Sequence, residues 1–263
     1  MRYCRFEMDG VARYALVERR GTEDFAVALM DARDGSFGDA LKDAFTPQPL
    51  SAIKLLAPVT PSKIICVGRN YADHATELGN DVPKEPLLFF KPPSSILAPG
   101  GTVIMPALSK RVDFEGEVGI VIGKRCRNVG PTEDVRQYIR GYTCVNDVTA
   151  RDIQKSDGQW TRGKGYDTFC PVGPIVTNEV DLITAPVTVT TRVNGAVKQQ
   201  GSTTDFLFPI AHLIRYISAC MTLEVGDLIP TGTPPGVSAV SAGDVVEVEV
   251  SNIGILRVTM KAE

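Results

Sequence analysis

The sequence predicts an α+β protein that is mostly β, with a small N-terminal β-rich domain at residues 1–57 and a larger domain at 58–263. The pairs Asp9-Gly10 and Asn194-Gly195 each join two strand-like runs, which is typical of a hairpin with a two-residue turn. The segment DVVEVEV, residues 244–250, alternates apolar and polar side chains as a half-buried strand does. These observations favour sheets at the start of the chain and throughout its last third.

The N-terminal part is predicted to be a small unit that caps or spaces the main domain. Its runs RYCRFEM and VARYALVER flank the turn at Asp9-Gly10. A helix-like stretch around Asp39 to Phe45 and the proline-bearing segment TPQPL follow. The boundary is placed near Leu56 to Pro61, where this unit leads into the main domain.

Composition narrows the function classes. Twenty-eight basic and thirty-one acidic residues give a net charge of −3, so nothing favours binding to nucleic acid or to an anionic membrane. No run approaches the roughly eighteen apolar residues of a membrane-spanning helix, and the N-terminus lacks the apolar core of a signal peptide. A cytoplasmic protein is therefore expected. The six cysteines are scattered without a C-x-x-C pair, which predicts reduced, mostly buried thiols instead of a zinc cluster or a disulfide framework.

The stretch RVDFEGEVGIVIGK, residues 111–124, places two carboxylates on one face of a predicted strand. Alternate residues of a strand share a face, so Glu115 and Glu117 stand side by side and repel unless something positive lies between them. The other residues of the strand are largely apolar, which predicts that it is covered on both sides. A buried acidic pair calls for a metal ion, a cationic partner or a shared proton. The alternative is a solvated edge strand.

A short helix is expected over RNYADHATELG, which follows the apolar strand-like run KIICVG, with Asn70 as its cap. On this helix His74 and Glu77 lie three residues apart and share a face. A carboxylate behind one ring nitrogen fixes the tautomer and raises the basicity of the other nitrogen, so the pair could activate a water. The alternative is an exposed pair on a surface helix. The second histidine, His212, is expected to be packed or to face a partner.

A third carboxylate follows the strand-like run in GYTCVNDVTARDIQ, which ends at Asn146-Asp147. Together with Glu115 and Glu117, Asp147 would offer only hard oxygen ligands. Such a set suits Mg²⁺, Mn²⁺ or Ca²⁺ and argues against zinc or copper. An anionic substrate beside this site would need cations nearby.

Several downstream residues could contact such a substrate. Arg151 and Gln154 lie three apart on the turn after Asp147, and Lys164 lies between two glycines in TRGKGYDTF, where the backbone can approach closely. The usual alternative for a lone cation is a solvated side chain. Further on, TLEVGDLIPTGTPPGV predicts a strand and a loop whose Thr231 and Thr233 hydroxyls and backbone N–H groups could hold a carboxylate.

Taken together, these motifs resemble the fumarylacetoacetate hydrolase superfamily, and they occur in that family's order. The matching segments are GRNYADHATELG, FFKPPSS, VDFEGEVGIVIGK, GYTCVNDVTARDIQ, GKGYDTFCPVGP, VNGAVKQQGSTTDFLF and MTLEVGDLIPTGTPPGV. They span roughly residues 61 to 260. The resemblance implies a mixed, mostly antiparallel β-roll around a central cavity, with the N-terminal residues as a small extra domain that some members carry.

The resemblance also implies roles for named residues. By position, the metal ligands are Glu115, Glu117 and Asp147. The catalytic dyad is His74 and Glu77, and Lys164 polarises the substrate oxygen. The residues that contact the acid or keto oxygens of the substrate are Arg151, Gln154 and Thr233. The implied cofactor is Mg²⁺ or Mn²⁺, and the implied assembly is a homodimer.

The implied activity is hydrolysis or decarboxylation of a small-molecule 2-oxo acid, an acylpyruvate or oxaloacetate, by carbon-carbon cleavage through a metal-stabilised enolate. The alternative is an isomerase or decarboxylase of 2-hydroxymuconate-type diacids, of the 2-hydroxyhepta-2,4-diene-1,7-dioate isomerase kind. A third hypothesis, from a different class, is a metal-bound ligand sensor or assembly protein without catalysis. The sequence does not choose between the first two, because the same dyad serves both chemistries.

Overall fold

The protein is mostly β, as predicted, in a computed structural model that describes residues 1–33, 36–41, 45–77, 79 and 81–263. Within the described residues the largest sheet has thirteen strands, and its main path runs β4-β3-β2-β1-β15-β13-β12-β18-β7-β8. Strands β5, β6 and β9 pair with β3, β1 and β15 beside this path. The bounds are β1 (Arg2–Met8), β2 (Val11–Arg20), β3 (Glu23–Arg33), β4 (Ser36–Leu41), β5 (Gln48–Pro49), β6 (Leu55–Leu56), β7 (Ile64–Gly68), β8 (Leu87–Lys91), β9 (Ile96–Leu97), β12 (Gly116–Ile122), β13 (Ile139–Asn146), β15 (Cys170–Thr177) and β18 (Leu228–Pro230).

A second sheet of five strands runs β10-β20-β19-β16-β17, and β11 pairs with β14 in a separate ribbon. These strands are β10 (Thr102–Met105), β11 (Val112–Asp113), β14 (Thr149–Ala150), β16 (Thr188–Val193), β17 (Ala196–Ser202), β19 (Val245–Val250) and β20 (Gly254–Ala262). Most strand pairs are antiparallel, and the parallel ones are β10 with β20, β9 with β15, and β7 with β18. The structure is therefore a mixed and mostly antiparallel β architecture.

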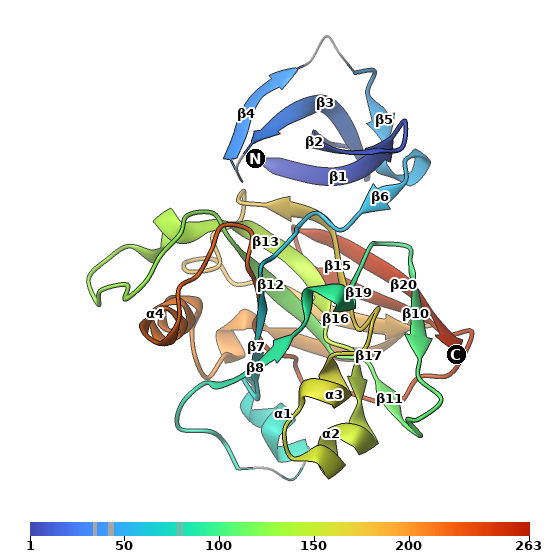
Figure 1. Ribbon diagram of the computed structural model, residues 1–263, viewed down its shortest axis with the longest axis vertical. Helices are drawn as coiled ribbons and strands as arrows, with labels where there is room; N and C mark the ends of the chain where they lie inside the picture. The colour runs from blue at the N-terminus through green and yellow to red at the C-terminus, as the bar shows by residue number, and fades with distance from the viewer. Residues whose placement is uncertain (34–35, 42–44, 78, 80) are drawn as a thin grey trace.

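The α-helices are few and short. They are α1 (Ala72–Glu77), α2 (Arg151–Asp157), α3 (Thr161–Lys164) and α4 (Ile210–Cys220), and 3-10 turns lie at η2 (Leu50–Ala52), η3 (Pro93–Ser95), η4 (Val135–Tyr138) and η5 (Thr203–Asp205). Figure 1 shows the N-terminal strands at one end of the molecule and α1, α2 and α3 together at the opposite end. None of the helices in the described ranges has the length and apolar character needed to cross a membrane.

Both predicted hairpins are present with the predicted turns. Asp9 and Gly10 have φ values of 53° and 74°, and Asn194 and Gly195 have φ values of 51° and 82°. Two consecutive residues with positive φ define the type I′ turn, which matches the twist of the flanking strands. The hairpins join β1 to β2 and β16 to β17.

The N-terminal strands continue the large sheet through β1, where Arg2 and Tyr3 pair with Thr177 and Val176 of β15. The helix expected around residues 39–45 is wrong where it can be tested, because residues 39–41 belong to β4, which pairs with β3. Residues 42–44 lie outside the described part of the chain. Cross-strand hydrogen bonds to β3 outweigh the weak local preference for a helix here. The domain division at residue 57 stays a prediction.

Strand β12 lies in the interior of the large sheet, between β13 and β18, and all of its residues are buried. Val118, Ile120 and Ile122 pack into the main core, which is shared with β16, β19 and β20 of the second sheet and with α4. Val121 packs into a second apolar cluster on the opposite face. Both faces of the strand are covered, as predicted, which excludes the solvated edge strand.

The six cysteines and His212 are not among the predicted site residues. All six cysteines are free thiols, and Cys220 is the exposed one. His212 is exposed on α4, and its ring stacks with Phe208 and Tyr216 at centroid distances of 5.7 and 6.0 Å. It is thus not a buried core residue, and the expectation that it faces a partner stays a prediction.

Candidate active site

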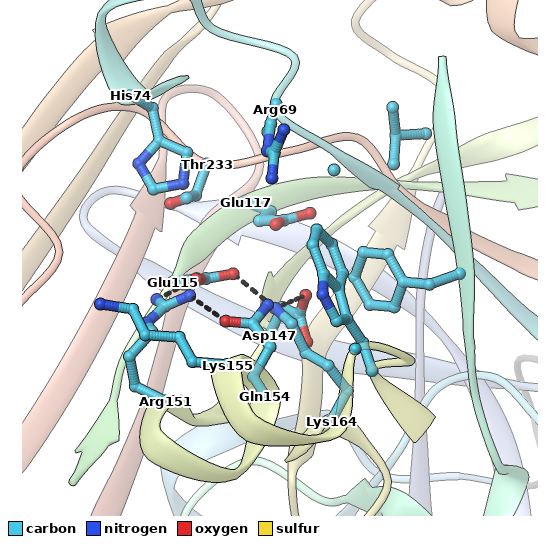
Figure 2. Close-up of a pocket in the computed structure, with 15 residues that line it drawn as sticks. Arg69, His74, Glu115, Glu117, Asp147, Arg151, Gln154, Lys155, Lys164 and Thr233 are labelled. Carbon is cyan, nitrogen blue, oxygen red and sulfur yellow. Dashed lines mark hydrogen bonds and ion pairs between the residues drawn. The ribbon is translucent and has the colours of Figure 1, made fainter. Parts of the chain in front are cut away.

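A cavity of about 290 Å³ opens among β7, β12, α1 and α2 and brings the predicted site residues together. Eight of the nine line it, namely His74, Glu115, Glu117, Asp147, Arg151, Gln154, Lys164 and Thr233. Glu77 is the ninth and contacts His74 instead of the cavity. Figure 2 shows His74 and Thr233 on one wall and Arg151, Gln154 and Lys164 on the wall opposite, with the carboxylates between them.

The three carboxylates lie close together because β12 begins beside the end of its antiparallel neighbour β13. Gly116, the first residue of β12, pairs with Asn146, the last residue of β13, so Glu115 and Asp147 flank the same point of the sheet. The Asp147 backbone N–H donates to the Glu115 carbonyl oxygen at 2.8 Å. One carboxylate oxygen from each of Glu115, Glu117 and Asp147 lies within 4.8 Å of the others, and all three residues are buried.

Two buried lysines neutralise part of this negative charge. Lys164 donates from Nζ to Glu115 Oε2 at 2.7 Å and to Asp147 Oδ2 at 2.6 Å. Lys91, at the end of β8, donates to the other oxygen of Asp147 at 2.5 Å and to the Val148 carbonyl at 3.1 Å. Asp147 is thus held by a lysine on each oxygen, which fixes the orientation of its carboxylate.

The glycines beside Lys164 have the role expected of them. A Cβ on Gly163 would lie 2.8 Å from the backbone of Gln154, and a Cβ on Gly165 would lie 2.5 Å from the Thr161 carbonyl oxygen. At Gly163, α3 lies against the backbone of α2, and Gly165 lies against a carbonyl of α3 itself, so only glycine fits at either position. The close packing is what aims the Lys164 side chain at the carboxylates.

Glu117 differs from the other two carboxylates. Its Oε2 accepts a hydrogen bond from the Gly232 N–H at 2.8 Å, but in the described ranges it forms no ion pair. Burial, and then the charges of Asp147 and Glu115, raise the pKa of Glu117 well above its ordinary value. Burial also acts to raise the pKa of Glu115, but Lys164 and Arg151 outweigh it and hold that pKa well below its ordinary value. Glu117 is therefore the carboxylate of this cluster that has no ion-pair partner in the described ranges.

A divalent cation fits this cluster. Three carboxylates offer the hard oxygen donors that Mg²⁺ and Mn²⁺ prefer, at a spacing that one ion can bridge. An ion there would compensate Glu117, which forms no ion pair in the described ranges, and would offset the burial and the repulsion from Asp147 and Glu115 that raise its pKa. The sequence left open a metal ion, a cationic partner or a shared proton. The structure contains cationic partners for Glu115 and Asp147, and it leaves Glu117 without an ion pair in the described ranges.

The His74–Glu77 pair forms as predicted. The Nδ1 of His74 lies 3.4 Å from Glu77 Oε2, and both oxygens of Glu77 accept from the Gly236 N–H at 3.1 Å. His74 is only 5 % exposed although Glu77 is exposed, so the two do not form the fully exposed pair of a surface helix. Burial lowers the pKa of His74 below its ordinary value, although the charge of Glu115 acts in the opposite direction. A neutral imidazole that donates from Nδ1 to Glu77 leaves Nε2 free to accept a proton.

Arg151 is more engaged with the protein than the sequence indicated. Its Nε donates to Asp113 Oδ2 at 2.8 Å, one terminal nitrogen donates to Gln154 Oε1 at 2.7 Å, and the other donates to Glu115. The guanidinium therefore orients Glu115 and Gln154. Because the Gln154 carbonyl oxygen is taken by Arg151, its amide NH₂ group remains for a ligand in the cavity.

The loop after β18 holds two carboxylates of the protein itself, Glu117 through the Gly232 N–H and Glu77 through the Gly236 N–H. Thr233 donates its hydroxyl to the Gly116 carbonyl at 2.8 Å and accepts from Gln199 at 2.7 Å. Gly232 has a φ of +100°, and a Cβ there would lie 2.7 Å from Asn70 Cβ. This loop is therefore locked against β7 and β12.

Asn70, expected to cap α1, contributes to the same lock. Its amide donates to the Thr231 carbonyl at 2.8 Å and accepts from the Phe208 N–H at 2.8 Å. The Asn70 side chain thus joins two loops that are distant in the sequence. These hydrogen bonds do not cap α1, which is the role that the sequence predicted.

Comparison with protein families decides the relationship. The family described as "Fumarylacetoacetate (FAA) hydrolase C-terminal" matches this chain over residues 63–261. The chain belongs to the fumarylacetoacetate hydrolase superfamily. The match covers the large sheet from β7 onward, the second sheet and all nine predicted site residues.

Solved structures and curated proteins of this superfamily resemble the chain over most of its length. A 2-hydroxyhepta-2,4-diene-1,7-dioate isomerase from Mycobacterium marinum is 39% identical, with a TM-score of 0.88 over 100% of this chain and 99% of that one. A fumarylacetoacetate hydrolase from Exiguobacterium antarcticum is 37% identical, with a TM-score of 0.87 and full coverage of both chains. The oxaloacetate tautomerase Fahd2a of Rattus norvegicus is 43% identical over 79% of this chain and 69% of its own.

Sequence reasoning missed two groups of site residues. Lys91 was passed over although FFKPPSS places a lysine directly after apolar strand residues, a signal like that of the paired glutamates. Arg69, Lys155 and Trp160 also line the cavity. No pattern in the local sequence predicts that these residues line the cavity, because their position depends on how α2, α3 and the end of β7 pack together.

Proposed function

We propose that the protein is a divalent-metal-dependent enzyme that moves a proton at the carbon next to the keto group of a 2-oxo acid, interconverting keto and enol or double-bond isomers. One observation carries the proposal. A buried His74, neutral because its pKa is lowered, shares a cavity with three carboxylates of which Glu117 lacks a cationic partner in the described ranges. The names of two relatives, a tautomerase and an isomerase, describe reactions of this kind.

Glu115, Glu117 and Asp147 would hold the metal ion. When bound, the ion would supply a Lewis acid that polarises the keto oxygen and favours loss of the neighbouring proton. The Nε2 atom of His74 accepts that proton and returns it at the same or at a conjugated carbon, while Glu77 stabilises the imidazolium through Nδ1. Lys164 contributes positive charge beside the developing enolate, and the free amide of Gln154 hydrogen-bonds an oxygen of the acid.

Hydrolytic or decarboxylating carbon-carbon cleavage, the first expectation from the sequence, is the second candidate. The relative named as a fumarylacetoacetate hydrolase supports it. The same His74 would then take a proton from water instead of carbon, and the water would attack the distal carbonyl. Decarboxylation of a β-keto acid would need the electron sink but no attacking water.

A substrate panel separates these outcomes. Oxaloacetate, acetylpyruvate, fumarylpyruvate and a 2-hydroxymuconate would each be followed by ultraviolet absorbance, with Mg²⁺ or Mn²⁺ and with EDTA. Enol–keto interconversion without loss of carbon supports proton transfer, and release of pyruvate supports cleavage. The absence of metal-dependent turnover on every compound would contradict both and favour a ligand-binding protein.

A further inference from the structure

Arg69 has an unusual backbone conformation. It follows Gly68, the last residue of β7, and its φ is +57°, in the left-handed region that non-glycine residues seldom adopt. Such strain persists only where the surrounding structure fixes it, and it concentrates at sites that position a side chain. Here the surroundings are tight, because a Cβ on Gly68 would lie 2.9 Å from the Trp160 ring.

The side chain of Arg69 lies beside an aromatic ring, and no described residue pairs with it as an anion. Its guanidinium carbon lies 6.0 Å from the centroid of the Trp160 ring, a cation–π contact. Within the described ranges it makes no hydrogen bond or ion pair. Arg151 and Lys164 differ, since each donates to carboxylates of the protein. Arg69 is therefore a half-buried cation whose donors remain available.

The position of Arg69 places those donors in the cavity. It lines the same space as His74 and the carboxylates. Figure 2 shows its guanidinium extending into the space from the wall that carries His74, toward Glu117 and across from Arg151 and Lys164. A ligand whose keto-acid end binds beside Gln154, at a metal ion that the carboxylates would hold, would present its other end to the wall where Arg69 lies.

We propose that Arg69 binds the second, distal carboxylate of the substrate, so that the cavity selects dicarboxylic over monocarboxylic 2-oxo acids. This assignment rests on the proposed function for the end of the substrate that carries the keto group. A guanidinium that lies over an indole ring still presents a planar fork that matches a carboxylate with two hydrogen bonds. Lys155 also lines the cavity but is exposed, so it attracts anions in general and does not select between them.

Binding can be measured without turnover, because Trp160 is the single tryptophan of the chain. The probes are 2-oxoglutarate and 2-oxopentanoate, which share a carbon chain length and differ by one terminal carboxylate. Each would be titrated in the presence of Mg²⁺, with Trp160 fluorescence and isothermal titration calorimetry as readouts. Losing a charge-assisted pair costs about tenfold in affinity or more. Arg69→Gln should therefore weaken 2-oxoglutarate binding by about that factor and leave 2-oxopentanoate binding within about twofold.

Two further variants sharpen the test. Arg69→Lys should retain part of the preference for the diacid, because a single ammonium replaces the fork. Lys155→Gln removes the same charge from the same cavity and should weaken both ligands slightly, with an effect that disappears at high salt. The assignment is overturned if wild type shows no preference for the diacid, if Arg69→Gln weakens both ligands equally, or if Lys155→Gln abolishes the preference as well.

The outcomes also separate this assignment from the proposed function. A preference for the diacid that depends on Arg69, in a protein that turns over no 2-oxo acid, would contradict the proposed function alone. Metal-dependent turnover together with equal binding of the two probes would contradict the role of Arg69 alone.

Discussion

The substitution Glu117→Gln tests the metal site at the carboxylate that has no cationic partner in the described ranges. Glutamine keeps the shape of the side chain and can still accept the hydrogen bond from the Gly232 N–H. It removes a carboxylate charge that no ion pair balances in the described ranges. If a divalent ion binds here, its affinity should fall sharply, whereas the metal-free protein should stay folded, because a neutral side chain suits this buried position better than a carboxylate does.

The size of the effect follows from linkage. An ion that binds only the folded state stabilises it by about 2.7 kcal/mol when its free concentration is a hundred times its Kd. For a chain of this length, 1 kcal/mol shifts Tm by roughly 2–4 °C. Mg²⁺ or Mn²⁺ should thus raise the Tm of the wild type by about 5–10 °C over its value in EDTA. The same addition should leave Glu117→Gln nearly unchanged.

The assay is thermal unfolding followed by circular dichroism, with metal and with EDTA. The matched control is Glu224→Gln, which removes a solvent-accessible carboxylate that is paired with Arg125 and does not line the cavity. This variant should keep the full metal-induced shift. An equal metal-induced shift in wild type and Glu117→Gln would refute the reasoning, because the ion would then bind elsewhere.

Four further predictions concern the dyad and the buried lysine. His74→Ala should lower turnover by about 10²–10⁴-fold with little change in KM, and full activity in the substrate panel would exclude it as the base. Since the pKa of His74 lies below its ordinary 6.5 and the base must be neutral, kcat/KM should rise with pH to a plateau, with a midpoint below 6.5. Glu77 acts to raise that pKa, so Glu77→Gln should move the midpoint further down, and an upward shift in the pH profile would contradict this. Lys91→Met should lower the free energy of unfolding of the metal-free protein by about 3 kcal/mol in urea, because Asp147 loses one of its buried partners. The control Lys54→Met, at an exposed ion pair, should lower it by under about 1 kcal/mol. Equal losses in the two variants would argue against the role of Lys91.

Local patterns were sufficient for much of the fold. The turns at Asp9-Gly10 and Asn194-Gly195 were predictable because adjacent residues that tolerate positive φ close a hairpin without help from the rest of the chain. The interior position of β12 was predictable because a strand that is apolar on both faces must be covered twice. The helix expected near residues 39–41 failed because pairing with β3 is a contact between strands that a local pattern does not contain.

The candidate site was likewise predictable from local patterns only in part. The spacing of Glu115 and Glu117 and of His74 and Glu77 put each pair on one face, and the motif order gave the family, which the comparison confirmed. The homodimer, the cytoplasmic location, the domain division and the roles of individual residues stay predictions. The spacing of residues along the sequence could not show which charged side chains form ion pairs in the folded site.

The sequence by itself determined the paired carboxylates, the histidine dyad and the superfamily, because each depends on residue type and on periods of two to four residues. Only the tertiary structure decided that Lys91 and Lys164 share Asp147, that Arg151 is occupied by Asp113 and Glu115, and that Glu117 and Arg69 are left without ionic partners in the described ranges. The physical reason is that the charge balance of a buried site depends on distances between side chains from separate strands and helices. Those distances are set when the sheets pack, and they determine where a metal ion and an acidic substrate can bind.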